Sequence, residues 1–344
     1  MNRTQERMLA MILNAATAFA LIPTSAESNT SPAAGAWKVL RPMIVPAVFA
    51  PAVVGPDSLI YVIGGSVAYD STDSLAVTRV YDLRTDRWTD GAPMPTPRIC
   101  PGAALGPDGK IYVIGGQEKR QALDTVEAYD VKSNTWTRCR PMPTARTDPS
   151  IIPARGADGR IRLFAIGGRD FRAPGNGLHT VEAYDPMTDI WTTMAPMPTH
   201  RHAQTEALGP DGLIYVIGGA NHDHAGFLDS VEVYDPIKNI WSTSEPLPYQ
   251  VECAMATSTT VSGGEILIFG GWRTPEKTET HTAFAFSPRA KTWRPLTDMP
   301  TARAAGAAVS ISTPDGTIHV CLMGGKDSEC SAEEYIFHLG ESAK

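Results

Sequence analysis

Four arginines share one local setting and could together bind an anion. Each lies five residues after the start of a short, mostly proline-flanked corner, and the four are Arg98, Arg146, Arg201 and Arg303. A guanidinium group can hold a carboxylate or a phosphate through two parallel hydrogen bonds. A ring of such groups would bind an acidic ligand. The alternative, which we favour, is that each arginine pairs with an acidic residue of a neighbouring repeat unit.

A second candidate is a histidine-rich segment. His222 and His224 flank Asp223, and His202 directly follows one of the four arginines. Imidazole and carboxylate groups this close could ligate zinc or copper, or act as an acid and a base. A pair of histidines two residues apart has no fixed third ligand, so solvated loop histidines are favoured. We therefore predict no bound metal and no cofactor.

A third candidate is a tryptophan beside an arginine. Trp272 and Arg273 come directly after a double glycine, and Arg169 follows another. An aromatic face next to a guanidinium group is suited to stacking on a sugar ring or on a side chain of a protein partner. The alternative for Trp272 is that it plugs a central channel.

The elements that must position these side chains repeat along the chain. Six apolar runs end in a double glycine, and the first glycines recur about every 52 residues, at Gly64, Gly115, Gly167, Gly218, Gly270 and Gly324. After each of the first five pairs comes an aromatic residue and, seven positions later, a tryptophan, as in Tyr129 and Trp136. A fixed period of this length indicates a repeat architecture.

Each unit is predicted to contain four short strands, A to D. Strand B is the apolar run, strand C alternates in character, and strand D begins at the tryptophan and ends at the corner. Proline cannot donate to a central ladder, so this corner marks the outer edge of the unit. The loops between strands B and C and the connections from D to the next A then lie on one face, where we expect any ligand site.

The two ends of the chain each hold an incomplete unit. The sixth unit has no tryptophan seven residues after Tyr335, while Trp37 and the Arg-Pro-Met that follows it reproduce the spacing seen at Trp136. The N-terminal segment is therefore predicted to supply strand D of the last unit, which closes six four-stranded sheets into a ring without free edges.

This pattern of apolar run, double glycine, tyrosine and tryptophan resembles the kelch repeat, and in particular exported bacterial kelch proteins. The resemblance implies an all-β, six-bladed kelch β-propeller with four-stranded blades. It leaves the activity open, because kelch proteins share a fold and differ widely in function. The recurring glycines, tyrosines and tryptophans are assigned to packing.

Composition and charge exclude some functions. The chain has 344 residues, of which 42% are hydrophobic and 19% charged, and a net charge of -7. This balance is typical of a globular protein, and the absence of a basic run argues against nucleic acid as a partner.

The first 26 residues have the order of a secretory signal: basic, apolar, then small residues. We predict a signal peptide at 1–26, a linker at 27–35 and a single propeller domain at 36–340, in a periplasmic or secreted protein. The apolar stretch is too short for a stable membrane span. Cys321 and Cys330 could form a disulfide in such a protein or remain thiols.

Two functions follow from the resemblance. The favoured one is a binding module without chemistry that recognises a carbohydrate or a protein on the loop face. The alternative is an enzyme similar to the bacterial sialic acid mutarotases, acting on a sugar acid, for which Glu252, Arg201 and His202 are the candidate catalytic residues. The long insertions of those enzymes are missing. The ligand sets of galactose oxidase and of the epithiospecifier kelch proteins cannot be placed in this sequence.

Overall fold

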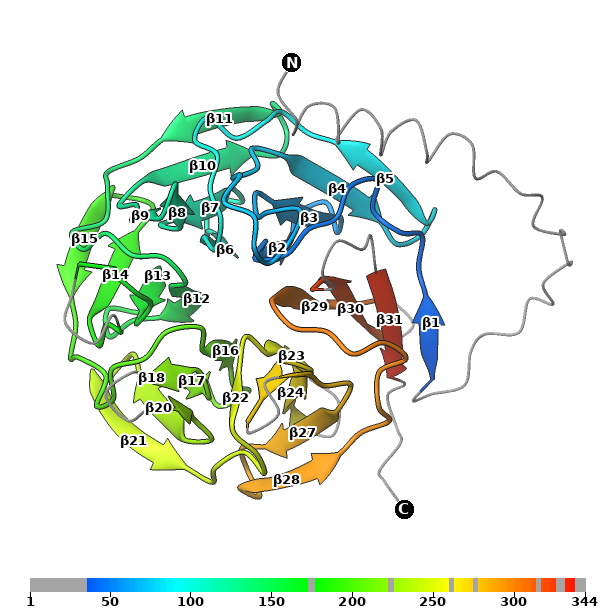
Figure 1. Cartoon of the computed structure of the whole chain (residues 1–344). Helices are drawn as coiled ribbons and strands as arrows, with labels where there is room; N and C mark the ends of the chain where they lie inside the picture. The colour runs from blue at the N-terminus through cyan, green and yellow to red at the C-terminus, as the bar shows by residue number, and fades with distance from the viewer. Residues whose placement is uncertain are drawn as a thin grey trace, which may run out of the picture. The chain divides into compact units, whose positions relative to one another are not determined.

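The computed structural model describes residues 36–172, 177–221, 226–259, 263–274, 278–313, 317–325 and 332–337. The chain from Ala33 onward forms one compact unit. Its strands form six four-stranded antiparallel sheets arranged as the blades of a ring (Figure 1). The predicted six-bladed all-β propeller is therefore confirmed.

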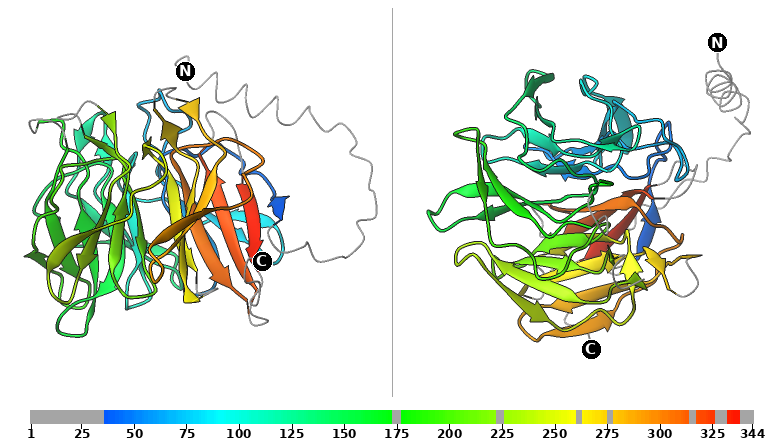
Figure 2. Two further views of the ribbon diagram at one scale, coloured as in Figure 1. Left: turned by 90° about the horizontal axis from the view of Figure 1, so that it is seen from below. Right: turned by 60° about the vertical axis from the view of Figure 1, so that its left-hand side comes forward.

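In every blade the first strand of the unit is innermost and the last is outermost, as the views of Figure 1 and Figure 2 show. Blade I contains β2 (Ala52–Val54), β3 (Ile60–Ile63), β4 (Thr78–Asp82) and β5 (Arg87–Asp90). Blade II contains β6 (Gly102–Leu105), β7 (Ile111–Ile114), β10 (Val126–Asp130) and β11 (Thr135–Arg138). Blade III contains β12 (Ser150–Arg155), β13 (Ile161–Ile166), β14 (Val181–Asp185) and β15 (Ile190–Thr193).

The other three blades repeat this order. Blade IV contains β16 (Thr205–Leu208), β17 (Ile214–Ile217), β20 (Val231–Asp235) and β21 (Ile240–Ser244). Blade V contains β23 (Met255–Thr259), β24 (Glu265–Phe269), β27 (Ala283–Ser287) and β28 (Thr292–Pro295). Blade VI contains β29 (Gly306–Ser312), β30 (Ile318–Gly324), β31 (Ala332–Phe337) and, from the other end of the chain, β1 (Trp37–Val39).

Strand β1 closes the ring as the sequence predicts. It pairs antiparallel with β31, and Trp37 lies opposite Tyr335. The same register joins Tyr129 to Trp136 in blade II. The N-terminal segment therefore replaces the missing outer strand of the last blade.

The recurring tryptophans hold neighbouring blades together. Each indole Nε1 donates a hydrogen bond to a backbone carbonyl of the preceding blade's outer corner; Trp136, for example, binds the Ala92 oxygen at 2.9 Å. The Trp136 ring also packs on the Tyr129 ring, with 5.0 Å between centroids. The residues of β7 are fully buried, as the continuous apolar run predicts.

The double glycines are required by a close approach of two backbones. Gly115 has a φ of +65°, and a Cβ atom there would lie 2.6 Å from the Arg146 carbonyl oxygen. Residues with a Cβ atom are disfavoured in this left-handed region. Glycine is therefore required both by the backbone conformation and by the lack of room for a Cβ atom.

Short extra strands lie in the loops that follow the double glycines and, for β22, in the connection from blade IV to blade V. They are β8 (Gln117–Glu118) with β9 (Gln121–Ala122), β18 (Ala220–Asn221) with β19 (Gly226–Phe227), and a three-stranded sheet of β22 (Val251–Glu252), β25 (Trp272–Arg273) and β26 (Thr278–Glu279). The edge-on view of Figure 2 shows β25 and β26, in yellow, projecting from one face of the ring. Within the described residues, no helix could span a membrane.

Candidate functional site

The four recurring arginines lie inside the blades. All four side chains are 0% exposed. Arg146 donates from Nη1 to the Gly167 and Thr180 carbonyl oxygens, both at 3.0 Å, and its Nη2 lies 2.7 Å from the Glu182 carboxylate. Its burial lowers the pKa of the guanidinium to about 10. Arg146 lies in the connection between blades II and III. Its hydrogen bonds therefore join this connection to the double glycine and the third strand of blade III.

The other three arginines have equivalent places. Arg98 pairs with Glu127 and Arg201 with Glu232, and Arg303 donates to the Gly324 carbonyl oxygen at 2.8 Å. The ligand-binding prediction for Arg98, Arg146, Arg201 and Arg303 is therefore wrong, because a fully buried guanidinium group cannot meet a ligand at the channel. The pairing that we favoured, with an acidic residue of the neighbouring unit, is found for Arg98, Arg146 and Arg201.

A ring of six residues, one between each pair of blades, surrounds the channel on the loop face. All six have a left-handed φ, between 51° and 56°, although none is a glycine. We call them the mouth ring: Phe49, Cys100, Asp148, Ala203, Cys253 and Ala305. Backbone N–H groups donate to the carbonyl of the preceding member, from Phe49 to Ala305, Cys100 to Phe49, Asp148 to Cys100, Cys253 to Ala203 and Ala305 to Cys253, at 2.7 to 3.0 Å. These bonds connect all six blades at the channel mouth.

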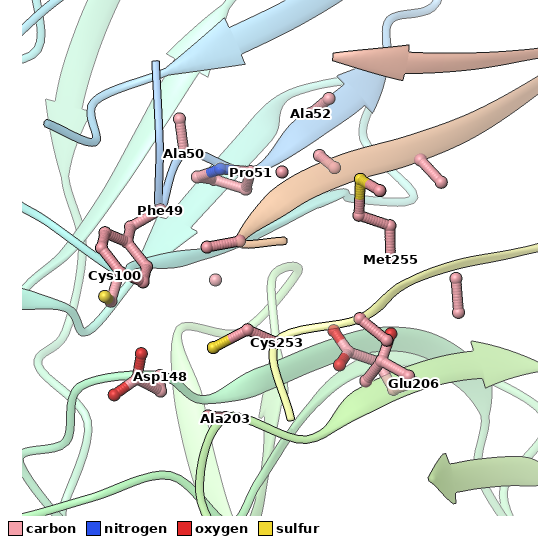
Figure 3. A pocket seen from close by; sticks show the side chains of 18 of the residues that line it. Phe49, Ala50, Pro51, Ala52, Cys100, Asp148, Ala203, Glu206, Cys253 and Met255 are labelled. Carbon is pink, nitrogen blue, oxygen red and sulfur yellow. The ribbon is translucent and has the colours of Figure 1, made fainter. Parts of the chain in front are cut away.

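A cavity of about 190 Å³ lies at the mouth ring and is lined by the first residues of five inner strands, β2, β6, β16, β23 and β29, and by Asp148 and Pro149 ahead of β12 (Figure 3). The ionisable groups of its wall are two carboxyls, Asp148 and Glu206, and two thiols, Cys100 and Cys253. Burial raises the pKa of both thiols, and for Cys100 the neighbouring Asp148 adds to this effect. The wall contains no lysine, arginine or histidine.

Glu206 is the functional candidate that sequence reasoning missed. It lies on β16 and accepts a hydrogen bond from the Ser150 hydroxyl at 2.8 Å. Burial raises the pKa of its carboxyl to about 7. A comparison of the inner strands could have found it, because the equivalent residue is alanine in four of the other five blades: Ala52, Ala103, Ala256 and Ala308.

Replacing Glu206 with glutamine is expected to remove a pH dependence of stability. Because the folded pKa is above the ordinary value, the folded state binds more protons, and stability falls as the pH rises from about 4.5 to about 7. The glutamine variant has no ionisable group at this position and therefore does not lose stability in this range. At pH 8 its free energy of unfolding should be higher than that of the wild type by roughly 1 to 3 kcal/mol. Urea unfolding at pH 4 and pH 8 measures this. A difference between the two proteins that does not change with pH would contradict the assignment, and Glu118→Gln serves as the control, since the Glu118 side chain is 40% exposed.

Three aromatic side chains from distant parts of the chain meet beside the mouth ring. The Tyr69 ring lies 4.9 Å from the Trp272 ring and 5.8 Å from the Phe49 ring, between centroids, and Phe49 lies 6.3 Å from Trp272. The Tyr69 hydroxyl donates to the Ala304 carbonyl oxygen at 3.0 Å, which fixes its loop over blade VI. All three rings are half-buried, so each presents part of its surface to solvent. We call this group the aromatic cluster.

The charged residues predicted beside Trp272 have other partners. The Arg273 guanidinium lies over the Tyr249 ring at 4.6 Å. Arg169 lies over the Phe171 ring at 4.5 Å and pairs with Asp148 of the mouth ring at 3.5 Å. The structure therefore brings Trp272 and Arg169 to the face around the channel mouth.

The candidate catalytic residues are not brought together as a substrate site. Arg201 donates to the Gly218 and Ser230 carbonyl oxygens inside blade IV, and His202 is 4% exposed. Glu252 is half-buried in β22, opposite Trp272. Because Arg201 is fully buried, its predicted catalytic role is wrong.

Two predictions fall on residues outside those that the structure describes. The first is the metal prediction for His222 and His224, which lie outside the described residues. Among the described residues, no group of three or more histidine, cysteine, aspartate or glutamate side chains is arranged to hold a metal ion. Cys330 is also outside the described residues, while Cys321 lies in β30 opposite Glu334. The disulfide between the two cysteines stays a prediction.

Comparison with known proteins agrees with this architecture. Residues 50–271 match the family model described as the KLHDC2/KLHL20/DRC7 Kelch-repeats domain, and residues 256–300 match the Kelch motif. Kelch-like protein 35 of Mus musculus is 28% identical over 177 residues, which is 51% of this chain and 27% of that protein. Kelch-like protein terF of Aspergillus terreus is 27% identical over 208 residues, 57% of this chain and 43% of that protein.

The chain thus spans less than half the length of these two relatives. Among solved structures, that of YjhT matches with a TM-score of 0.68 and 17% sequence identity, covering 87% of this chain and 96% of that chain. At this identity the match concerns the fold alone.

Proposed function

Because the chain belongs to the kelch-repeat family, we propose that it is a binding module that recognises a protein partner at the loop face around the mouth ring. The aromatic cluster carries this proposal. Tyr69 and Trp272 are outside the repeat pattern, and the mouth-ring position of Phe49 holds non-aromatic residues in the other five places, so the propeller scaffold does not require these three aromatic side chains. Partly exposed aromatic side chains on rigid elements are typical of residues that dominate binding energy at protein interfaces.

The surroundings of the cluster support a binding surface. Tyr69 is fixed by its hydroxyl, and Trp272 is fixed by the pairing of β25 with β22 and β26. Ordering these side chains in advance lowers the entropy lost when a partner binds. The Asp148–Arg169 pair adds polar groups on the same face.

A carbohydrate ligand is the second candidate, since an aromatic ring can stack on a sugar ring. The sugar-acid enzyme alternative has less support, because its arginine, Arg201, is fully buried. Binding without chemistry is therefore the function that we propose.

Replacing Trp272 with alanine is expected to weaken partner binding by more than tenfold, because hot-spot aromatic residues contribute about 2 kcal/mol or more. The test compares wild type and Trp272→Ala as baits against extract of the source cells, with quantified capture, and then measures affinity for the protein recovered. Met187→Ala is the control, since Met187 is 66% exposed and lies in the β14–β15 turn, on the face opposite the loops.

Equal capture by the wild type and Trp272→Ala would refute the aromatic cluster as the binding surface. A thermal-shift screen against neutral and acidic sugars is run in parallel. Stabilisation by a sugar that Trp272→Ala abolishes, with no protein captured, would favour the carbohydrate candidate. A saturated site at 100 times Kd adds about 2.7 kcal/mol of stability.

Export to the periplasm or outside the cell is also part of the proposal. It is supported by the basic, apolar and small-residue order of residues 1–26, which lie outside the described residues. N-terminal sequencing of the protein from its source cells is expected to begin after Ala26. An intact Met1 would contradict export through a cleaved signal.

A further inference from the structure

The inner strands place one charged side chain on the cavity wall, Glu206, at a position where the fold calls for none. The six inner strands are β2, β6, β12, β16, β23 and β29, and the charged residues within them are Glu206 and Arg155. Arg155 is exposed at the far end of β12, where its Nη1 donates to the Gly159 carbonyl oxygen. The cavity wall at Glu206 consists otherwise of small and apolar residues, mainly alanine and proline, apart from the polar mouth-ring groups, Gln204 and Thr205.

Buried polar groups from blade III and from the residue ahead of β16 hold the Glu206 carboxyl in place. Gln204 donates from Nε2 to the Ser150 hydroxyl at 2.9 Å and to the Ile166 carbonyl oxygen at 3.1 Å. The Ser150 hydroxyl thus accepts from Gln204 and donates to Oε2 of Glu206. A backbone hydrogen bond from Ile151 also reaches this carboxyl. A carboxylate has about four acceptor positions on its two oxygens, so these two hydrogen bonds leave others for a ligand.

The scaffold does not require a carboxyl at this position. Alanine serves in four other blades, at Ala52, Ala103, Ala256 and Ala308. An ionised carboxylate in an apolar channel is unfavourable unless a positive charge comes to it. A carboxyl group in apolar surroundings that the fold does not require is a candidate ligand-binding residue. Because the carboxylate is negative, the ligand that it binds should carry a positive charge.

We propose that the channel binds an alkylammonium group, with the Glu206 carboxylate as its counter-ion and the alanine and proline side chains around its methylene chain. An ammonium group has three N–H donors and no acceptor, which suits an acceptor-only carboxylate. No lysine, arginine or histidine lines the cavity, and Asp148 at the mouth is a second carboxylate, which pairs with Arg169 outside the cavity wall at 3.5 Å. The inference concerns the channel and does not need the partner of the aromatic cluster.

Binding of the ammonium group is coupled to the proton of Glu206. Because the pKa of this carboxyl is raised, the amine displaces a proton near neutral pH, and affinity should fall about tenfold per pH unit below pH 7. Ionisable groups near it are Cys100, Cys253 and Asp148 on the cavity wall, Arg169, which pairs with Asp148, and Tyr215 on β17. Strand β12 carries Arg155 at its exposed far end, and the facing strands β2, β6, β23 and β29 contain no ionisable residue. The raised pKa values of the two thiols and of Tyr215 keep these groups neutral in this range.

The test is a titration of the folded protein at pH 8 with n-butylamine, n-butanol and butyrate, followed by NMR chemical shifts of residues on the channel wall. We expect the amine to bind at least tenfold more tightly than the neutral and anionic analogues. Glu206→Gln and Glu206→Ala should both lose this preference, and the alanine variant carries the residue that four other blades have. Glu118→Gln is the charge-matched control and should bind as the wild type does.

The source of the ammonium group is distinguished with Nα-acetyl-lysine methylamide and its Nε-acetylated form. Binding of the first and not the second assigns a lysine side chain of a partner, whereas binding of n-butylamine alone assigns a free amine. The proposal is overturned if no amine binds at pH 8, if n-butanol binds equally well, or if Glu206→Gln leaves amine binding unchanged. Trp272→Ala should keep amine binding, so failure of the channel site and failure of the aromatic cluster are separable.

Discussion

Deletion of residues 36–43 is expected to leave the protein unfolded or aggregated at 37 °C. The deletion removes β1 and its ladder with β31, so blade VI presents a free edge. It also removes Leu40 and Met43, each 2% exposed, from the core between blades VI and I. Loss of one buried leucine or methionine side chain costs about 2 to 5 kcal/mol, and a whole domain has only about 5 to 15 kcal/mol.

Circular dichroism, thermal unfolding and gel filtration measure this result. Two point variants separate closure from general damage to the N-terminus. Leu40→Ala should lower the free energy of unfolding by about 2 to 5 kcal/mol, whereas Val39→Ala, at a residue that is 71% exposed, should change it by less than about 0.5 kcal/mol. A deletion variant that melts within a few degrees of the wild type would show that the ring is stable without its closing strand.

The sequence was sufficient to predict the fold because every blade contains the same local information. The double glycines, the Tyr129 and Trp136 pairs and their equivalents mark the strands, and the leftover Trp37 shows how the ends meet. The contacts of these residues are nearly the same in each blade. Their period therefore determines both the strand order and the closure.

The candidate site was less predictable because it depends on contacts between blades. The mouth ring has left-handed residues such as Phe49 and Cys100, which are not the types that signal a positive φ, so their sequence gives no warning. The aromatic cluster joins Tyr69 to Trp272 across about 200 positions of the sequence. Glu206 becomes visible only when the inner strands are aligned by their register.

Replacing Glu182 with alanine is expected to lower the free energy of unfolding by about 3 to 5 kcal/mol. Its carboxylate accepts from the Arg146 guanidinium at 2.7 Å and from the Thr144 hydroxyl at 2.7 Å, and Glu182 is 3% exposed. The variant leaves the charge of Arg146 buried without its counter-ion, which is more costly than the loss of the attraction alone. Urea unfolding at pH 7 measures the change.

The exposed pair of Arg172 and Asp170 provides the matched comparison. Its N–O distance is 2.9 Å, close to that of the buried pair, but the Arg172 side chain is 72% exposed. Arg172→Ala should therefore change stability by less than about 1 kcal/mol, because the Arg172 guanidinium is already largely in water, where solvent screens its attraction to Asp170. If Glu182→Ala also changed the free energy of unfolding by less than about 1 kcal/mol, the recurring arginines would not be essential for joining the blades, and their recurrence would need another explanation. A large effect at Glu182 and a small one at Arg172 would show that burial, and not the ion pair itself, makes these arginines structural.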